Sequence, residues 1–64
     1  MKRVDFERHL RVHGCRLIRE GAKHSVYHKS GNNLTSTLPR HSEIFPSLVR
    51  KICKDLDITA PRGR

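Results

Sequence analysis

Hydrophobic positions near the N-terminus recur with the period of a helix. Phe6, Leu10 and His13 fall at i, i+4 and i+7, which places them on one helix face. Asp5 is a suitable N-cap because its carboxylate accepts from free amides of the first turn. A glycine directly after His13 is typical of a helix end. The pattern predicts a first helix over about residues 4–13.

A stronger helical pattern lies near the C-terminus. Pro46 suits the first position of a helix, and Ser47 is a candidate cap. The apolar residues that follow repeat with helical spacing over about residues 46–55; they are Leu48, Val49, Ile52, Cys53 and Leu56. We therefore expect a second amphipathic helix there.

The segment between the helices predicts three strands, over residues 15–20, 24–29 and 34–38, with Pro39 ending the third. In the second strand, alternation sets His24, Val26 and His28 against Ser25, Tyr27 and Lys29. In the first strand, the adjacent pair Leu17 and Ile18 leaves the inward face undecided. Short turns join the strands, so an antiparallel meander is expected.

These elements define an α+β fold of order α-β-β-β-α. A three-stranded sheet must bury one face, and the two helices are the cover available for it. We expect one domain over residues 1–58, followed by a basic tail at 59–64. The opposite face of the sheet and its turns are left for function.

The net charge of the chain narrows the class of its partner. The 64 residues contain fourteen Lys and Arg against six Asp and Glu, a formal net charge of +8. Such an excess favours a polyanionic partner such as nucleic acid. A chain this short has no room for a deep substrate cavity, so its ligand must lie across the surface. No apolar run approaches the length of a membrane span or a signal peptide, and we expect a cytoplasmic protein without membrane contact.

The two cysteines, Cys15 and Cys53, are too few for a disulfide-rich secreted protein, and we expect them to be buried apolar residues. Five histidines raise the question of zinc. His9 and His13 are four residues apart, but two ligands alone make a weak site. The sequence also lacks an acidic cluster suited to Mg²⁺, so we expect no metal and no other cofactor.

The candidate chemistry centres on a hairpin in which Lys23 directly precedes His24. An imidazole beside a fixed cation suits the handling of a phosphodiester: the histidine moves a proton, and the cation holds an anion and favours the neutral imidazole. Gly21 supplies the permissive backbone of the turn. Read without this context, His24 is an ordinary polar strand residue.

Other residues are candidates for supporting roles. His41 follows the third strand and is a candidate second proton-transfer group, although it also suits a helix entry. Lys29 and Arg40 are candidate phosphate contacts, as is Lys23. Glu20 either orients an imidazole across the turn or pairs with a neighbouring cation, and we interpret His28 as a plain strand residue.

In order and spacing, these segments resemble the HicA (YcfA-like) toxins of prokaryotic toxin–antitoxin pairs, over residues 1 to about 58. The matching segments are His13-Gly14-Cys15-Arg16-Leu17-Ile18-Arg19, Gly21-Ala22-Lys23-His24, Leu38-Pro39-Arg40-His41 and Pro46-Ser47-Leu48-Val49-Arg50-Lys51-Ile52-Cys53. The family fold is similar to the double-stranded RNA-binding domain. Ala22-Lys23 before the histidine and Phe45-Pro46-Ser47 at the second helix depart from the family pattern, and we expect these departures to bear on substrate preference or partner contacts.

The resemblance implies a metal-independent mRNA interferase, an endoribonuclease with His24 essential, that is neutralised by a HicB-type antitoxin in a hetero-oligomer. Two alternatives remain open. A non-catalytic RNA-binding module of the same fold needs the same charge but not His24. A basic protein that binds only its acidic mate would act on no RNA at all.

Overall fold

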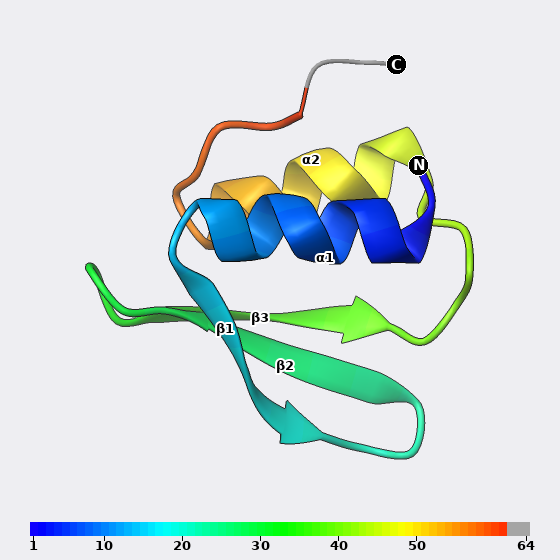
Figure 1. Cartoon of the computed structure of the whole chain (residues 1–64), viewed down its shortest axis with the longest axis horizontal. Coiled ribbons are helices and arrows are strands. Elements are labelled where there is room, and N and C mark those ends of the chain that lie inside the picture. The colour runs from blue at the N-terminus through cyan, green and yellow to red at the C-terminus, as the bar shows by residue number, and fades with distance from the viewer. Residues whose placement is uncertain (62–64) are drawn as a thin grey trace.

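The computed structural model, which describes residues 1–61, confirms the α-β-β-β-α order. Two helices lie together on one side of a three-stranded antiparallel sheet (Figure 1). The elements are α1 (Arg3–Val12), β1 (Cys15–Glu20), β2 (His24–Lys29), β3 (Leu34–Pro39) and α2 (Pro46–Asp55). The sheet order is β1-β2-β3, so β2 is central and pairs with both neighbours. No helix within residues 1–61 is long and apolar enough to cross a membrane.

Both helices begin earlier than their predicted caps. Asp5 is not the N-cap of α1: that position is Lys2, and Asp5 lies in the first turn, where its charge favours the helix dipole. The first amide of α1, on Arg3, donates to the carbonyl of Ser42 at 2.9 Å, so one free amide of the first turn is satisfied without a side-chain cap. Ser47 is likewise inside α2, whose N-cap is Phe45 and whose first residue is the proline expected there.

The sheet register shows which side chains share a face. Directly opposite residues in paired strands project to the same side. The covered face, beneath the helices, holds the buried residues Cys15, Ser25, Tyr27, Ser36 and Leu38, with Leu17 and Glu20 in register beside them. The open face holds Arg16, Arg19, His24, Val26, His28, Thr35 and Thr37. β3 includes Pro39, which stands opposite His24; an edge strand tolerates proline there.

A β-bulge in β1 resolves the ambiguity of Leu17 and Ile18. Leu17 pairs with Tyr27, but the next paired residue is Arg19, opposite Val26. Ile18 is therefore an extra residue, 55% exposed, and the alternation of β1 shifts by one after it. The shift places Arg19 on the open face and Glu20 on the covered face.

The core lies between the covered face and the helices. Both predicted apolar stripes contribute to it, and its fully buried members include Phe6, Leu10, Leu38, Ile44, Ile52 and Leu56. Cys15 and Cys53 are buried free thiols, as expected. Gly14, directly after α1, has a φ of +83°, the conformation that favours glycine at a helix end. Of the basic tail expected at 59–64, residues 62–64 lie outside the described part of the chain.

Candidate functional site

The β1–β2 hairpin holds His24 at the first position of β2 through close backbone contacts. The amide of Gly21 donates to the carbonyl of His24 at 2.7 Å. A Cβ at Gly21 would lie 3.1 Å from that oxygen, a tighter approach than most Cβ atoms make, so this position favours glycine. His24 is exposed and lies on the open face, since its neighbour Ser25 is buried beneath α1.

The segment after β3 lies against the same hairpin. The amide of Arg40 donates to the carbonyl of Lys23 at 3.3 Å, and Pro39 is the cross-strand partner of His24. The backbone therefore brings Lys23, His24, Arg40 and His41 to one end of the sheet. All four side chains are exposed. These are two candidate proton-transfer groups and two candidate phosphate contacts.

Three of the five histidines are held by hydrogen bonds within the fold. His9 Nε2 lies 2.7 Å from the carbonyl oxygen of Thr59, and His13 Nδ1 lies 3.0 Å from the carbonyl oxygen of His9. His28 Nε2 lies 2.8 Å from Asn33 Oδ1. Within residues 1–61, the imidazoles of His24 and His41 make no such bond. The two free histidines are thus the two at the hairpin end of the sheet.

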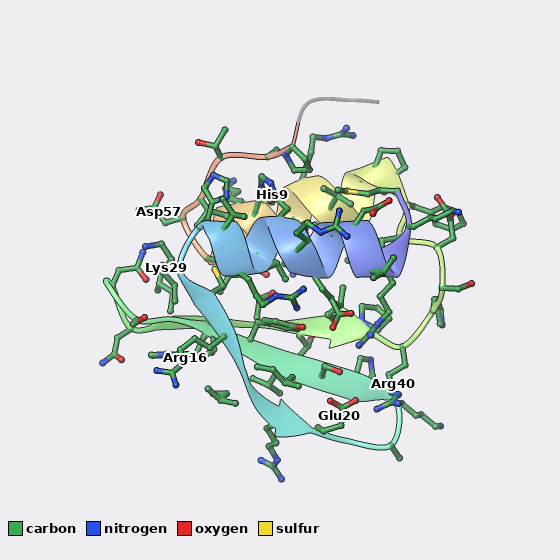
Figure 2. The ribbon with its side chains drawn as sticks, viewed as in Figure 1. His9, Arg16, Glu20, Lys29, Arg40 and Asp57 are labelled. Atoms are coloured by element: carbon green, nitrogen blue, oxygen red, sulfur yellow. The ribbon has the colours of Figure 1, made fainter. Side chains whose placement is uncertain are left out.

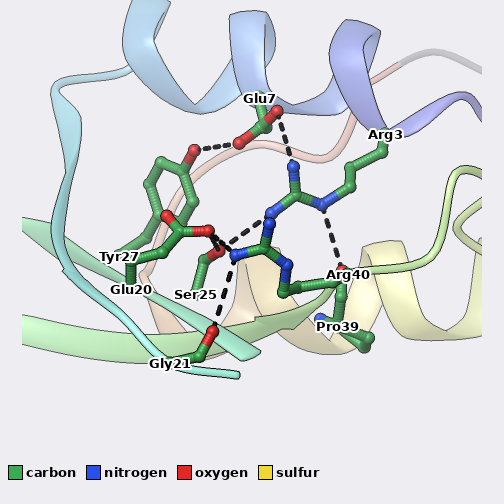
Figure 3. Close-up of polar contacts among 8 residues, drawn as sticks. All are labelled: Arg3, Glu7, Glu20, Gly21, Ser25, Tyr27, Pro39 and Arg40. Atoms are coloured by element: carbon green, nitrogen blue, oxygen red, sulfur yellow. Dashed lines mark hydrogen bonds and ion pairs between the residues drawn. The ribbon is translucent and has the colours of Figure 1, made fainter. Parts of the chain in front are cut away.

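A polar network on the covered face supports the hairpin from behind (Figure 3). The guanidinium of Arg3 donates to Ser25 Oγ at 2.9 Å, to the carbonyl of Pro39 at 3.2 Å and to Glu7 at 3.1 Å. Ser25 follows His24 in the chain, and Pro39 is the cross-strand partner of His24. Arg3 therefore connects the first turn of α1 to two residues beside His24: the next residue in the chain and the cross-strand partner.

The same network accounts for the carboxylates near the hairpin. Tyr27 donates its hydroxyl to Glu7, and burial together with this carboxylate raises the pKa of Tyr27. Glu20 accepts from Ser25 Oγ at 3.2 Å and forms an ion pair with Arg40. Glu20 thus pairs with a distant cation, not with the adjacent ones that the sequence suggested, because the bulge turns it toward the covered face.

The predicted phosphate contacts separate into two groups. Lys23 adjoins His24, and Arg40 lies at the same end with its guanidinium against Glu20 and the carbonyl of Gly21 (Figure 2). Lys29 is at the opposite end of β2, five residues from His24 or about 16 Å of strand. Its ammonium lies near the turns that contain Gly14 and Gly31. Lys29 therefore does not share a phosphate with His24.

Sequence reasoning did not single out Arg3, Arg16 or Arg19. Arg3 contacts the site through its side chain from a helix distant in the chain, and no local motif marks such a contact. Arg16 shares a cross-strand pair with His28, and Arg19 with Val26. Under strict alternation, Arg16 and Arg19 would lie on opposite faces because they are three residues apart. The extra residue Ile18 shifts the alternation and brings both to the open face. The adjacent Leu17 and Ile18 were the available signal for the bulge.

Residues 1–61 contain no group of three His, Cys, Asp or Glu side chains placed to hold a metal ion. His24 begins β2 and is exposed on the sheet face that the helices leave uncovered (Figure 1). This arrangement offers a histidine and several cations to a ligand that lies across the sheet. It suits a long anionic ligand better than a small molecule.

The fold and these side chains define the class: a small basic α-β-β-β-α domain that presents a histidine and exposed cations at one end of its sheet. The family comparison makes this class specific: the model for the HicA toxin of bacterial toxin–antitoxin systems matches residues 4–58. The chain belongs to the HicA toxin family, whose members are generally ribonuclease toxins. Comparisons with curated proteins and with solved structures found no significant match.

Proposed function

We propose that this toxin is an endoribonuclease that cleaves mRNA at His24 and is neutralised by a HicB-type antitoxin. The observation that carries the proposal is the placement of His24. His24 is exposed, its imidazole makes no hydrogen bond within residues 1–61, and it is flanked by Lys23 and the Arg40–His41 segment. The other strand histidine, His28, is engaged by Asn33. Family membership supports the same activity.

In this proposal His24 accepts the proton of a ribose 2′-hydroxyl as its oxygen attacks the adjacent phosphorus. The bond to the 5′-oxygen breaks, and that oxygen leaves with a proton from a second group, for which His41 is our candidate. The products are a 2′,3′-cyclic phosphate and a 5′-hydroxyl. Balanced in this way, the reaction needs no redox partner and no group beyond proton donors, acceptors and cations.

The cations stabilise the charge that develops on the phosphorane. Lys23 is the cation closest to His24 in the chain. Arg40 uses Nη1 for its contacts with Glu20 and the Gly21 carbonyl, and its other N–H groups remain for a phosphate at the hairpin. A phosphate contact by Lys29 would be with a nucleotide several positions away. The antitoxin, in this proposal, covers His24 and thereby blocks access of the RNA.

The test compares purified wild type, His24→Ala and the matched control His13→Gln on a long mRNA in excess EDTA, analysed on gels. We expect His24→Ala to lose cleavage by about 100-fold or more, the usual contribution of a positioned acid or base. The control should cut like wild type, since His13 lies at the end of α1. Equal cleavage by wild type and His24→Ala would overturn the assignment.

His41→Ala then tests the second group. A proton donor for the leaving oxygen should lower kcat with little change in KM, and the loss should shrink with a substrate whose leaving group needs no proton. If all variants bind RNA and none cleaves it, the protein is a binding module and not a ribonuclease.

A further inference from the structure

The acidic and basic side chains of this protein are segregated with respect to the sheet. All six acidic residues lie away from the open face; they are Asp5, Glu7, Glu20, Glu43, Asp55 and Asp57. Five of them are already in ion pairs with cations of the helix side or of the loops. Glu20 is the only acidic residue in β1 to β3, and the bulge turns it to the covered face, where it stays exposed at the hairpin end and pairs with Arg40.

The open face is left with cations, histidines and threonines, together with Val26 and Pro39. Its cross-strand rows are Arg16–His28–Thr35, then Arg19–Val26–Thr37, then His24–Pro39. Both arginines are exposed, and within residues 1–61 neither forms an ion pair. The rows repeat every two residues along β2, about 7 Å, which is comparable to the spacing of neighbouring phosphates in an extended RNA strand.

We propose that the open face is a track for single-stranded RNA, in which Arg16 and Arg19 hold the phosphates of nucleotides next to the one cleaved at His24. The inference rests on the proposed function, since it takes RNA as the ligand of the His24 site. It adds the surface on which the RNA lies, the single-stranded form of that RNA, and two residues that contact its phosphates.

Two features select a single strand. Duplex recognition by folds of this class spans about 16 base pairs and two minor grooves, which is longer than a sheet of six-residue strands, about 20 Å. A single strand, in contrast, follows three rows of side chains directly. The second feature is the position of His24 in the end row, which places the track on one side of the scissile phosphate.

The face also lacks Phe, Tyr and Trp side chains for base stacking. Phe6 is in the core and Tyr27 is on the covered face, while Phe45 precedes α2. Affinity therefore comes mainly from phosphate contacts, which are sequence-tolerant and sensitive to salt. Base preference at the cut site must come from the hairpin itself.

The experiment measures binding separately from cleavage. Binding of an unstructured 12-nucleotide RNA is titrated in the His24→Ala background at several salt concentrations. Arg16→Gln/Arg19→Gln is compared with Arg50→Gln/Lys54→Gln, which removes the same charge from exposed positions of α2. We expect the open-face pair to weaken binding about tenfold or more near 0.1 M salt and to lower the salt slope by about 1.4, while the control stays near the parent. Circular dichroism checks that every variant is folded.

Three results would overturn the track: equal losses from both pairs, no loss from the open-face pair, or tighter binding of a 12-base-pair duplex than of the single strand. A loss of binding to an acidic protein partner but not to RNA also counts against it. Cleavage by the chains with His24 intact separates the two proposals. If wild type cuts and the open-face pair binds and cuts like the control, the track falls and the ribonuclease stands. If wild type does not cut but RNA binding depends on the open face, the ribonuclease falls.

Discussion

Both faces of the sheet carry polar side chains, and they use them differently. On the covered face, Arg3 and Glu20 are tied into hydrogen bonds that join α1, β1, β2 and the segment after β3. On the open face, Arg16, Arg19 and His24 have no such partners within residues 1–61. Polar groups beneath the helices must be satisfied because their desolvation is costly, whereas those in water are free to meet a ligand. The same residue types thus serve stability on one face and binding on the other.

The largest effect on stability is expected when an arginine of the covered side, Arg3 of α1, is replaced by methionine, which has a similar length and no charge. Arg16 of the open face is replaced in the same way for comparison. Arg3→Met removes the hydrogen bonds that Arg3 donates to Ser25, Glu7 and the carbonyl of Pro39, and we expect the free energy of unfolding to fall by about 2 kcal/mol. Arg16→Met should change it by less than about 0.5 kcal/mol. Urea unfolding followed by circular dichroism measures both, and equal losses would contradict the contrast.

We also expect Arg3→Met to change the kinetics of RNA cleavage. Because Arg3 contacts the backbone neighbours of His24, its loss should lower kcat for RNA cleavage more than it raises KM at a temperature where the variant is folded. Arg16→Met should chiefly raise KM. The reverse pattern would show that Arg3 does not position the hairpin.

An effect of intermediate size concerns alkaline pH, which acts on the covered side alone. Burial raises the pKa of Cys15 and of Tyr27, and it raises the pKa of Cys53 to about 11. The folded protein keeps protons that the unfolded chain releases, so this stability is complete below the ordinary pKa values of these groups and is lost as pH rises through the folded values. Between about pH 8 and pH 10 we expect a loss on the order of 1 kcal/mol.

Urea unfolding in the presence of a reducing agent measures this pH dependence. Tyr27→Phe removes one of the titrating groups and should make the alkaline loss shallower. Constant stability over this range would show that ionisation of these buried groups is not coupled to folding.

The smallest effect compares two adjacent residues of β3. Ser36 donates to Asp55 Oδ2 at 3.0 Å, and the pKa of Asp55 is lowered by hydrogen bonds from Lys51 and then from Ser36. Ser36→Ala should cost roughly 0.5–1 kcal/mol and shift the pKa of Asp55 back toward its ordinary value. Thr37→Val, on the open face, should be close to neutral. NMR titration of the Asp55 carboxyl checks the first expectation, and unfolding measures both.

Much of the fold could be predicted because its signals are local. Period 3.6 in α2, period 2 in β2 and the helix-ending glycine at position 14 each depend on a few neighbouring residues. The start of α1 was less accessible: its N-cap is Lys2, not Asp5, and its first amide donates to the carbonyl of Ser42, 39 residues away in the chain. A distant backbone partner leaves no local pattern.

The candidate site divides in the same way. His24 and its neighbour Lys23 belong to a local motif and were found from it. The separation of Lys29 from His24 follows from strand length, so it could have been anticipated. The contacts of Arg3 and the pairing of Glu20 with Arg40 depend on how α1 and the bulge meet the sheet, and these required the structure.

The bulge at Ile18 has a consequence for variation in chain length. Residues on either side of Ile18 already pair in continuous order, Leu17 with Tyr27 and Arg19 with Val26. Deletion of Ile18 would therefore leave every other β1 residue on its present face. Insertion or deletion elsewhere in β1 would exchange the faces of Arg16, Arg19 or Glu20. Among relatives, we expect gaps in this strand to concentrate at the position of Ile18, with an arginine followed by an acidic residue kept beside them.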